Sequence, residues 1–356
     1  MPISDYSEYD ALALAELVRT RQVTALELVD AAIERIERHN PVLNAVVHRA
    51  FDEARDAAKG PLPDGPFTGV PFLIKDLGQR VAGWPRTSAS FYAEVKADAD
   101  DSELVRRYRA AGLVLTGKTN TPEFGIPGVT HSERLGACRN PWNPDHVSGG
   151  SSGGAAAAVA SGMVPVAHAS DGLGSIRIPA ACCGLVGLKP TRDRNPNGGE
   201  DADRAIGFSV DHVVSRTVRD SAAMLDATGY PEPASPYAYP KKERPYLEEA
   251  GRAPGRLKIF WSAQTPSGRP YMGVTNWVAN AGPSPEFWNI YKEGIERSDE
   301  VLSLTVTTYD NPYNTPKQIR QLEREVGGTK EDIDQWLLAK RPITKGKYFS
   351  DKTINL

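Results

Sequence analysis

Two serines in glycine-rich loops are the residues of this chain best suited to nucleophilic chemistry. Ser151 lies in residues 149–154 (GGSSGG), and Ser175 closes residues 170–175 (SDGLGS). Glycines beside a serine allow successive backbone N–H groups to converge on one point, as the stabilisation of an oxyanion requires. A pair of ordinary glycine-rich turns is the competing interpretation, and composition alone leaves both open.

A lysine stands at the end of an apolar run that is typical of a short buried strand. Residues 69–76 read GVPFLIKD, so the charge of Lys75 follows directly after the apolar positions. Taken without the serines, a lysine that reaches solvent is the favoured interpretation. Lys75 can act as a base only if burial lowers its pKa enough to leave the amine neutral.

These segments resemble the amidase signature family. The similarity lies in GGSSGG (149–154), DGLGSIRIPA (171–180) and CGLVGLKPT (183–191), together with the lysine motif GVPFLIKD. The resemblance implies an amide hydrolase that needs neither cofactor nor metal. It implies that Ser175 is the nucleophile, that Ser151, after a cis peptide, relays the proton, and that Lys75 is the base.

The resemblance also implies an oxyanion hole made of backbone N–H groups. These belong to Gly172, Leu173, Gly174 and Ser175. Leu173 stands where the family often has a small residue, which predicts a narrower pocket. Asp193 replaces the glycine that is usual in the family's T-R-G-R motif, which predicts a disturbed loop there.

The resemblance covers about residues 9–259 and implies an α/β fold. It is the amidase signature fold, a mixed central β-sheet covered by helices on both faces. Helical patterns occupy residues 9–19, 24–39 and 49–59, and Thr24 with Glu27 form a capping box before a run that Asn40-Pro41 should end. Further along, residues 155–161 predict a helix, 164–169 a buried strand, and 208–230 a strand followed by a helix.

One motif points to a different chemistry. Residues 112–119, GLVLTGKT, match the phosphate-loop pattern to the letter. Their middle residues are typical of a strand, and Thr121-Pro122 follows where a helix should already run. The sequence therefore favours a buried strand over nucleotide binding.

Residues 260–356 form an atypical C-terminal segment without an amidase pattern. They predict helices that begin at Ser284-Pro285, at Thr315-Pro316 and at Thr329, and a strand over 302–306. The segment faintly resembles the large subunit of phage terminases, but no ATPase motif accompanies it, so no activity is assigned. We expect the amidase fold to be incomplete at its C-terminus and the enzyme to be weakened. A non-catalytic or incomplete amidase-like scaffold is the alternative function.

Composition limits the partners. A net charge of −3 implies no nucleic-acid partner, and no apolar run reaches the length of a membrane span. An acidic N-terminus and three cysteines, Cys138, Cys182 and Cys183, predict a cytoplasmic protein with buried free thiols. Within the family, GKTNTPE, ACRNPWN, PVAH and GLKPTR are similar to the 6-aminohexanoate cyclic dimer hydrolase type, which implies a small linear or cyclic amide substrate. A homodimer is left open.

Overall fold

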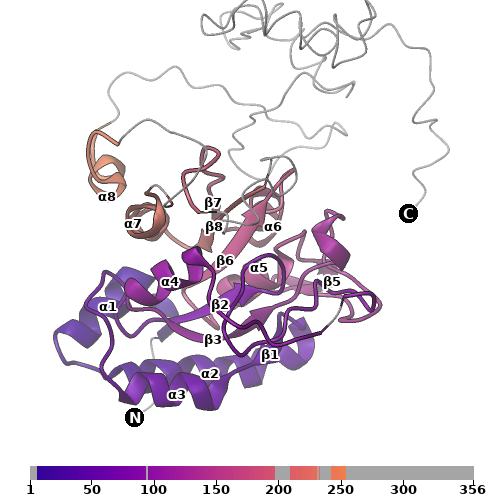
Figure 1. Cartoon of the computed structure of the whole chain (residues 1–356), viewed down its shortest axis with the longest axis horizontal. Helices are drawn as coiled ribbons and strands as arrows, with labels where there is room; N and C mark the ends of the chain where they lie inside the picture. Colours follow the sequence, from indigo (N-terminus) through magenta and orange to yellow (C-terminus); the bar gives the residue numbers. More distant parts are fainter. Residues whose placement is uncertain (1–5, 94, 197–208, 231, 233–241, 254–356) are drawn as a thin grey trace, which may run out of the picture. The chain divides into compact units, whose positions relative to one another are not determined.

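The computed structural model describes residues 6–93, 95–196, 209–230, 232 and 242–253 (Figure 1). All of them lie in the first of the two units into which the chain divides, Met1–Ala253. The elements predicted for the tail and the boundary predicted at residue 259 lie outside the described residues.

A six-stranded mixed sheet forms the centre of the described part, in the order β1-β3-β2-β6-β8-β7. Strands β3, β2 and β6 run parallel in the middle, whereas β1, β8 and β7 pair antiparallel with their neighbours. The strands are β1 (Val46–Arg49), β2 (Pro71–Lys75), β3 (Val114–Thr119), β6 (Val166–Asp171), β7 (Val186–Gly187) and β8 (Val210–Ser215). A separate two-stranded sheet pairs β4 (Arg139–Asn140) with β5 (Asn143–Val147).

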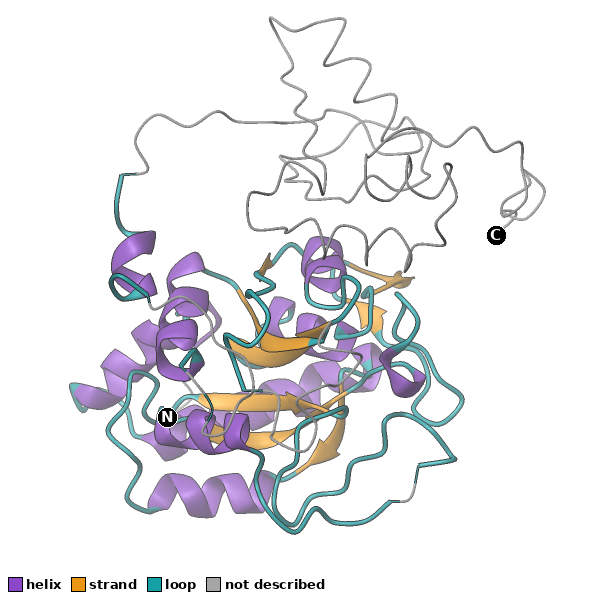
Figure 2. Ribbon diagram, turned by 45° about the horizontal axis from the view of Figure 1, so that its top comes forward, coloured by secondary structure: helices purple, strands orange, loops and turns teal. Residues whose placement is uncertain are grey.

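Helices flank the strands on both sides (Figure 2). The helices are α1 (Ala11–Arg19), α2 (Ala25–Leu43), α3 (Phe51–Lys59), α4 (Glu103–Ala110), α5 (Gly153–Ala160), α6 (Arg177–Cys183), α7 (Val218–Thr228) and α8 (Tyr246–Ala250). Short 3-10 turns cover Tyr6–Glu8 and Glu123–Gly125. The α/β fold with a mixed, helix-covered sheet that the sequence predicted is confirmed. None of the described helices is long and apolar enough to cross a membrane.

Helix α2 begins as predicted but ends later. Thr24 and Glu27 form both hydrogen bonds of the capping box. The prediction that Asn40-Pro41 stops the helix is wrong, because Pro41 lies in the last turn of a helix that continues to Leu43 and is capped by Asn44, whose φ is 50°. Proline removes one backbone donor there. The Asn40 side chain in turn accepts the N–H groups of Ala45 and Val46 at 2.8 and 2.7 Å, which fixes the exit of the chain toward β1.

The phosphate-loop match is a buried strand, as predicted. Residues Val114–Thr119 form β3, and every one of them is buried. The Lys118 Nζ donates a hydrogen bond to the Pro85 carbonyl at 2.6 Å. A lysine held inside the sheet in this way is not available to a phosphate group.

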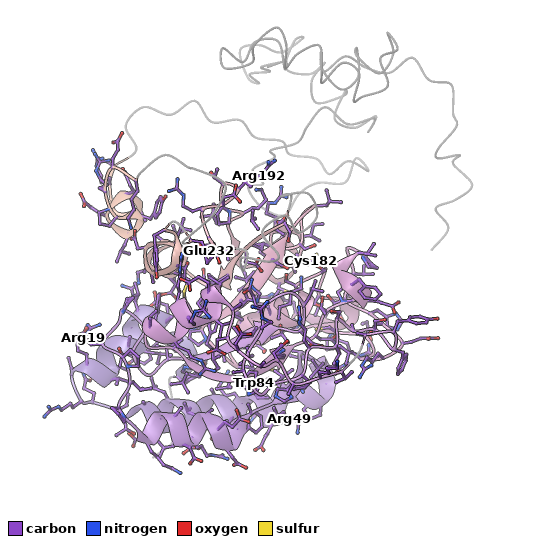
Figure 3. The ribbon with its side chains drawn as sticks, in the orientation of Figure 1. Arg19, Arg49, Trp84, Cys182, Arg192 and Glu232 are labelled. Carbon is purple, nitrogen blue, oxygen red and sulfur yellow. The ribbon has the colours of Figure 1, made fainter. Side chains whose placement is uncertain are left out.

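The three cysteines are free thiols, but only two are buried. Cys138 and Cys183 are buried as predicted, whereas the prediction for Cys182 is wrong because its side chain is exposed. Figure 3 labels Cys182. Adjacent positions of a helix point about 100° apart, so the two neighbouring cysteines of α6 face different directions, and here only Cys183 faces the interior.

A buried histidine of β8 gives the fold a pH dependence. His212 is fully buried, and burial lowers its pKa to about 3 from the ordinary value of 6.5. Between these values the unfolded chain takes up a proton that the folded chain refuses, so stability falls as the pH drops below 6.5. We expect the difference in unfolding free energy between the native chain and His212→Gln to shrink by about 1.4 kcal/mol per pH unit below that pH.

Urea unfolding of both proteins from pH 8 to pH 5 measures this difference. The comparison cancels the opposite contribution of Asp220, whose pKa burial raises to about 6. A difference that stays the same at pH 5 and pH 8 would contradict the assignment of a neutral, buried His212.

Candidate active site

Lys75 and Ser151 meet in the interior of the protein. Lys75 has no exposed surface, and its Nζ lies 2.7 Å from the Ser151 Oγ. The same Nζ also lies within hydrogen-bond distance of two further hydroxyls, at 3.0 Å from Ser152 and 3.1 Å from Ser170. An amine surrounded by three hydroxyls, one of them on a cis-linked serine, can exchange protons with Ser151 without leaving the interior.

The parallel strands explain how the lysine reaches this place. Lys75 is the last residue of β2, and its neighbour β6 runs in the same direction to Asp171. The carboxyl ends of parallel strands meet at one edge of the sheet, where ligands of α/β proteins commonly bind. Beyond the strand, the Asp76 carboxylate accepts a hydrogen bond from the Thr87 N–H at 3.0 Å and fixes the chain that leaves Lys75.

Two threonine side chains hold the loop before α5, which contains Ser151. The peptide bond between Gly150 and Ser151 is cis. The Thr121 Oγ1 donates to the Ser151 carbonyl at 3.0 Å, and the Thr130 Oγ1 donates to the Gly149 carbonyl at 2.8 Å. Two threonines from the segment after β3 therefore fix the backbone on either side of the cis peptide.

Ser175 joins this group through its backbone. The Ser152 N–H, at the N-terminus of α5, donates to the Ser175 carbonyl at 3.2 Å. This hydrogen bond ties the loop of the predicted nucleophile to the loop of Ser151. Ser175 itself is half-buried, whereas Ser151 and Lys75 are buried. Of the three residues, Ser175 is thus the one that a ligand can reach most easily.

Asp171 organises the loop that carries Ser175. Its buried carboxylate accepts the N–H groups of Gly174 at 2.7 Å and Ile176 at 3.1 Å, and the Arg177 guanidinium binds it at 2.9 and 3.0 Å. Burial alone would raise the pKa of Asp171, but the hydrogen bonds from Arg177 and from these N–H groups lower it. The carboxylate therefore stays charged and holds the turn on both sides of Ser175.

One of the four N–H groups predicted for the oxyanion hole has an acceptor within its own loop. The Gly174 N–H donates to the Asp171 Oδ1 at 2.7 Å. The N–H groups of Gly172, Leu173 and Ser175 donate to no other described residue. The Leu173 side chain is 90% exposed. It therefore lies at the surface, and the described residues do not show the narrowed pocket that was predicted from it.

The loop after the core motif keeps the conformation that glycine favours. Asp193 has a φ of 60°, in the left-handed region. Aspartate enters this region more readily than most residues. The aspartate thus takes the backbone conformation that the usual glycine would take.

Gly125 leaves little room for a side chain beside Leu77 and Ser151. A Cβ at this position would lie 2.5 Å from Leu77 Cδ2 and 3.3 Å from the Ser151 Oγ. The φ of Gly125 is +68°, and the turn that it ends covers Glu123–Gly125. The segment after β3 is thus one wall of the group around Ser151.

We expect Gly125→Ala to lower amide hydrolysis by about 100-fold, because displacement of Ser151 by a fraction of an ångström disturbs proton transfer. Gly83→Ala is the matched control. Gly83 also has a positive φ, +79°, but a Cβ there would meet nothing within 4 Å. Both variants carry the backbone strain of about 1 kcal/mol, and only the first changes the site. Equal activities of the two purified variants would show that Gly125 has no such role.

Sequence reasoning missed several residues that surround Lys75. Ser152 and Ser170 bind its Nζ, and the His168 Nδ1 accepts its backbone N–H at 3.2 Å. The alternation of a strand could have indicated two of them, because His168 and Ser170 lie on the same face of β6. Among the described residues, no group of three or more His, Cys, Asp or Glu side chains is arranged to hold a metal ion.

Comparison with known proteins gives one family. Residues 27–281 match the family model described as Amidase. A 6-aminohexanoate-cyclic-dimer hydrolase of Paenarthrobacter ureafaciens is 44% identical over 263 residues, which cover 73% of this chain and 53% of the relative. The chain thus spans about half the length of this curated relative.

Solved structures of similar fold also belong to amidases. The structure of 6-aminohexanoate cyclic dimer hydrolase has a TM-score of 0.69 at 34% identity, and the match covers 95% of this chain and 69% of that one. A bacterial aryl acylamidase of the amidase signature enzymes has a TM-score of 0.59 at 36% identity, with coverage of 66% and 50%. With a family model that matches well over half of its residues, a shared fold and a buried lysine joined to the serine loops, the chain belongs to the amidase family.

Proposed function

We propose that this chain hydrolyses the carbon–nitrogen bond of a small amide through an acyl-enzyme on Ser175. The observation that carries the proposal is the buried contact of 2.7 Å between Lys75 Nζ and Ser151 Oγ, with the Ser175 backbone bound to the neighbouring Ser152. A serine hydroxyl is a weak nucleophile until a base accepts its proton. Lys75, reached through Ser151, is the base that these residues offer.

In the first half-reaction the Ser175 Oγ attacks the amide carbonyl carbon. Its proton passes to Ser151, which gives its own proton to Lys75, so the amine must be neutral beforehand. The N–H groups of Gly172, Leu173 and Ser175 stabilise the resulting oxyanion. When the intermediate collapses, the C–N bond breaks, and the proton returns through Ser151 to the leaving nitrogen, which departs as an amine.

In the second half-reaction a water molecule replaces the amine. It attacks the ester carbon on Ser175 and passes its proton along Ser151 to Lys75. Collapse of the second intermediate breaks the ester bond, returns the proton to Ser175 and releases a carboxylic acid.

We assign this activity to the predicted amidase core, residues 1–259, and none to residues 260–356. For the substrate we propose a small linear or cyclic aliphatic amide, because the chain is similar to a 6-aminohexanoate-cyclic-dimer hydrolase over most of its length. A cytoplasmic location is part of the same proposal and rests on the three free cysteines.

The purified chain, incubated with an aryl amide and with the cyclic dimer of 6-aminohexanoate, tests the proposal. We expect release of amine from at least one of them and its loss in Ser175→Ala. A folded chain that releases amine from neither substrate would favour the alternative, a non-catalytic amidase-like scaffold.

A further inference from the structure

The backbone of Lys75 is held by a side chain where a strand would ordinarily supply a carbonyl. The register of β2 and β6 has one pair, Leu73 with Ala167. Two residues further along β2, the Lys75 N–H donates to the His168 Nδ1 at 3.2 Å instead. The imidazole of His168 therefore bridges the two strands at the point where the lysine leaves the sheet.

A carboxylate orients this imidazole. The His168 Nε2 lies 2.9 Å from the Asp211 Oδ1, and both side chains are buried, with exposed fractions of 0% and 1%. A backbone N–H can only donate, so the His168 Nδ1 accepts, and the ring proton stands on Nε2 and is donated to Asp211. The Tyr108 ring packs edge-on against the imidazole at 6.0 Å between centroids and limits its rotation.

Two residues of β6 thus bind Lys75, one at its backbone and one at the end of its side chain. His168 binds the backbone N–H of Lys75, and Ser170, two residues later on the same face, binds its Nζ at 3.1 Å. Asp211 lies opposite Ser170 in the register of β8, so His168, Ser170 and Asp211 come from one pair of adjacent strands. Proton transfer depends steeply on donor–acceptor geometry, and a fixed backbone keeps the long lysine side chain in register with Ser151.

We propose that His168, oriented by Asp211, is a positioning residue that fixes Lys75 for proton exchange with Ser151. The inference rests on the proposed function of Lys75 as the base. It assigns His168 no contact with substrate. The essential interaction is the hydrogen bond that Nδ1 accepts.

Two amide variants separate this interaction from simple burial of a polar group. In His168→Asn the side-chain oxygen can occupy the place of Nδ1 and accept the Lys75 N–H. In His168→Gln the amide reaches the place of Nε2 and Asp211 but leaves the Lys75 N–H without its acceptor. His168→Leu removes both interactions, and His212→Gln is the control, because His212 is equally buried on the neighbouring strand but contacts Ser221 and Asn195.

The first readout is kinetic. We expect kcat, and the rate at which a serine-directed fluorophosphonate phosphonylates Ser175 with loss of fluoride, to fall about 100-fold in His168→Gln and His168→Leu, with KM nearly unchanged. His168→Asn should stay within about tenfold of the native chain and His212→Gln within about twofold, as expected for residues that keep the geometry of the base. Equal rates in His168→Asn and His168→Gln would overturn the inference.

The second readout is structural and does not require turnover. Crystal structures of the variants should show the Lys75 Nζ beyond hydrogen-bond distance of the Ser151 Oγ in His168→Gln and within it in His168→Asn. A lysine that keeps its position in His168→Gln and His168→Leu would overturn the inference. If the proposed function is wrong, the native chain will be neither labelled nor active. The crystal structures would then still test whether His168 positions Lys75.

Discussion

Ser175→Ala is expected to abolish amide hydrolysis, with a loss of about 10⁴-fold or more. The Ser175 Oγ is the atom that forms the covalent bond in the proposed reaction, and no neighbouring hydroxyl can replace it without moving the loop that Asp171 holds. Ser151 is buried and engaged with Lys75, so it is a poor substitute. Amine release from an aryl amide under single-turnover conditions measures the effect.

The stability of this variant separates chemistry from folding. The backbone hydrogen bond that Ser175 accepts from Ser152 does not involve the side chain. The unfolding free energy of Ser175→Ala should therefore lie within about 0.5 kcal/mol of the native value. Residual turnover above a few per cent in a normally folded variant would exclude Ser175 as the nucleophile.

Lys75→Met should lower the rate of acylation by about 10³-fold or more, because it removes the base and keeps a side chain of similar length. The hydroxyls of Ser151, Ser152 and Ser170 each lose their partner at Nζ. Part of the loss could therefore come from rearrangement of these serines, and a control must match the burial of the lysine as well as its charge.

Lys118→Met supplies this control. Lys118 is also fully buried, lies on the adjacent strand β3, and donates its Nζ hydrogen bond to the Pro85 carbonyl instead of to a serine. Both variants remove one buried amine from the same sheet, and both should unfold more readily. We expect only Lys75→Met to lose the reaction with a serine-directed reagent. Comparable losses of labelling in the two variants would indicate a general effect of buried lysines on the fold.

The candidate residues could be named from the sequence, whereas much of the geometry that supports them could not. Ser151, Ser175 and Lys75 stand in motifs whose types and spacing carry the resemblance, and strand β3 could be separated from a nucleotide loop by its apolar residues alone. The end of α2 could not be predicted from the sequence, because the side chain of Asn40 supports a turn that contains Pro41. Local propensity does not include a hydrogen bond to a residue beyond the helix.

The supporting residues of the site depend on contacts that are distant in sequence. The Gly174 N–H donates to Asp171, whose carboxylate collects several donors of the same turn. His168 and Asp211 lie on β6 and β8, and only the antiparallel register of these strands brings them together. A motif records which residues are present, whereas these roles follow from which strand lies beside which.

The identity of the residue that forms the covalent intermediate tests the proposed reaction most directly. The native chain and Ser175→Ala would be treated with a fluorophosphonate, digested and examined by mass spectrometry. We predict one adduct in the native chain, on the peptide that contains Ser175, and no adduct in the variant. An adduct on Ser151 or Ser152, or labelling that persists in Ser175→Ala, would contradict the assignment of Ser175 as the nucleophile.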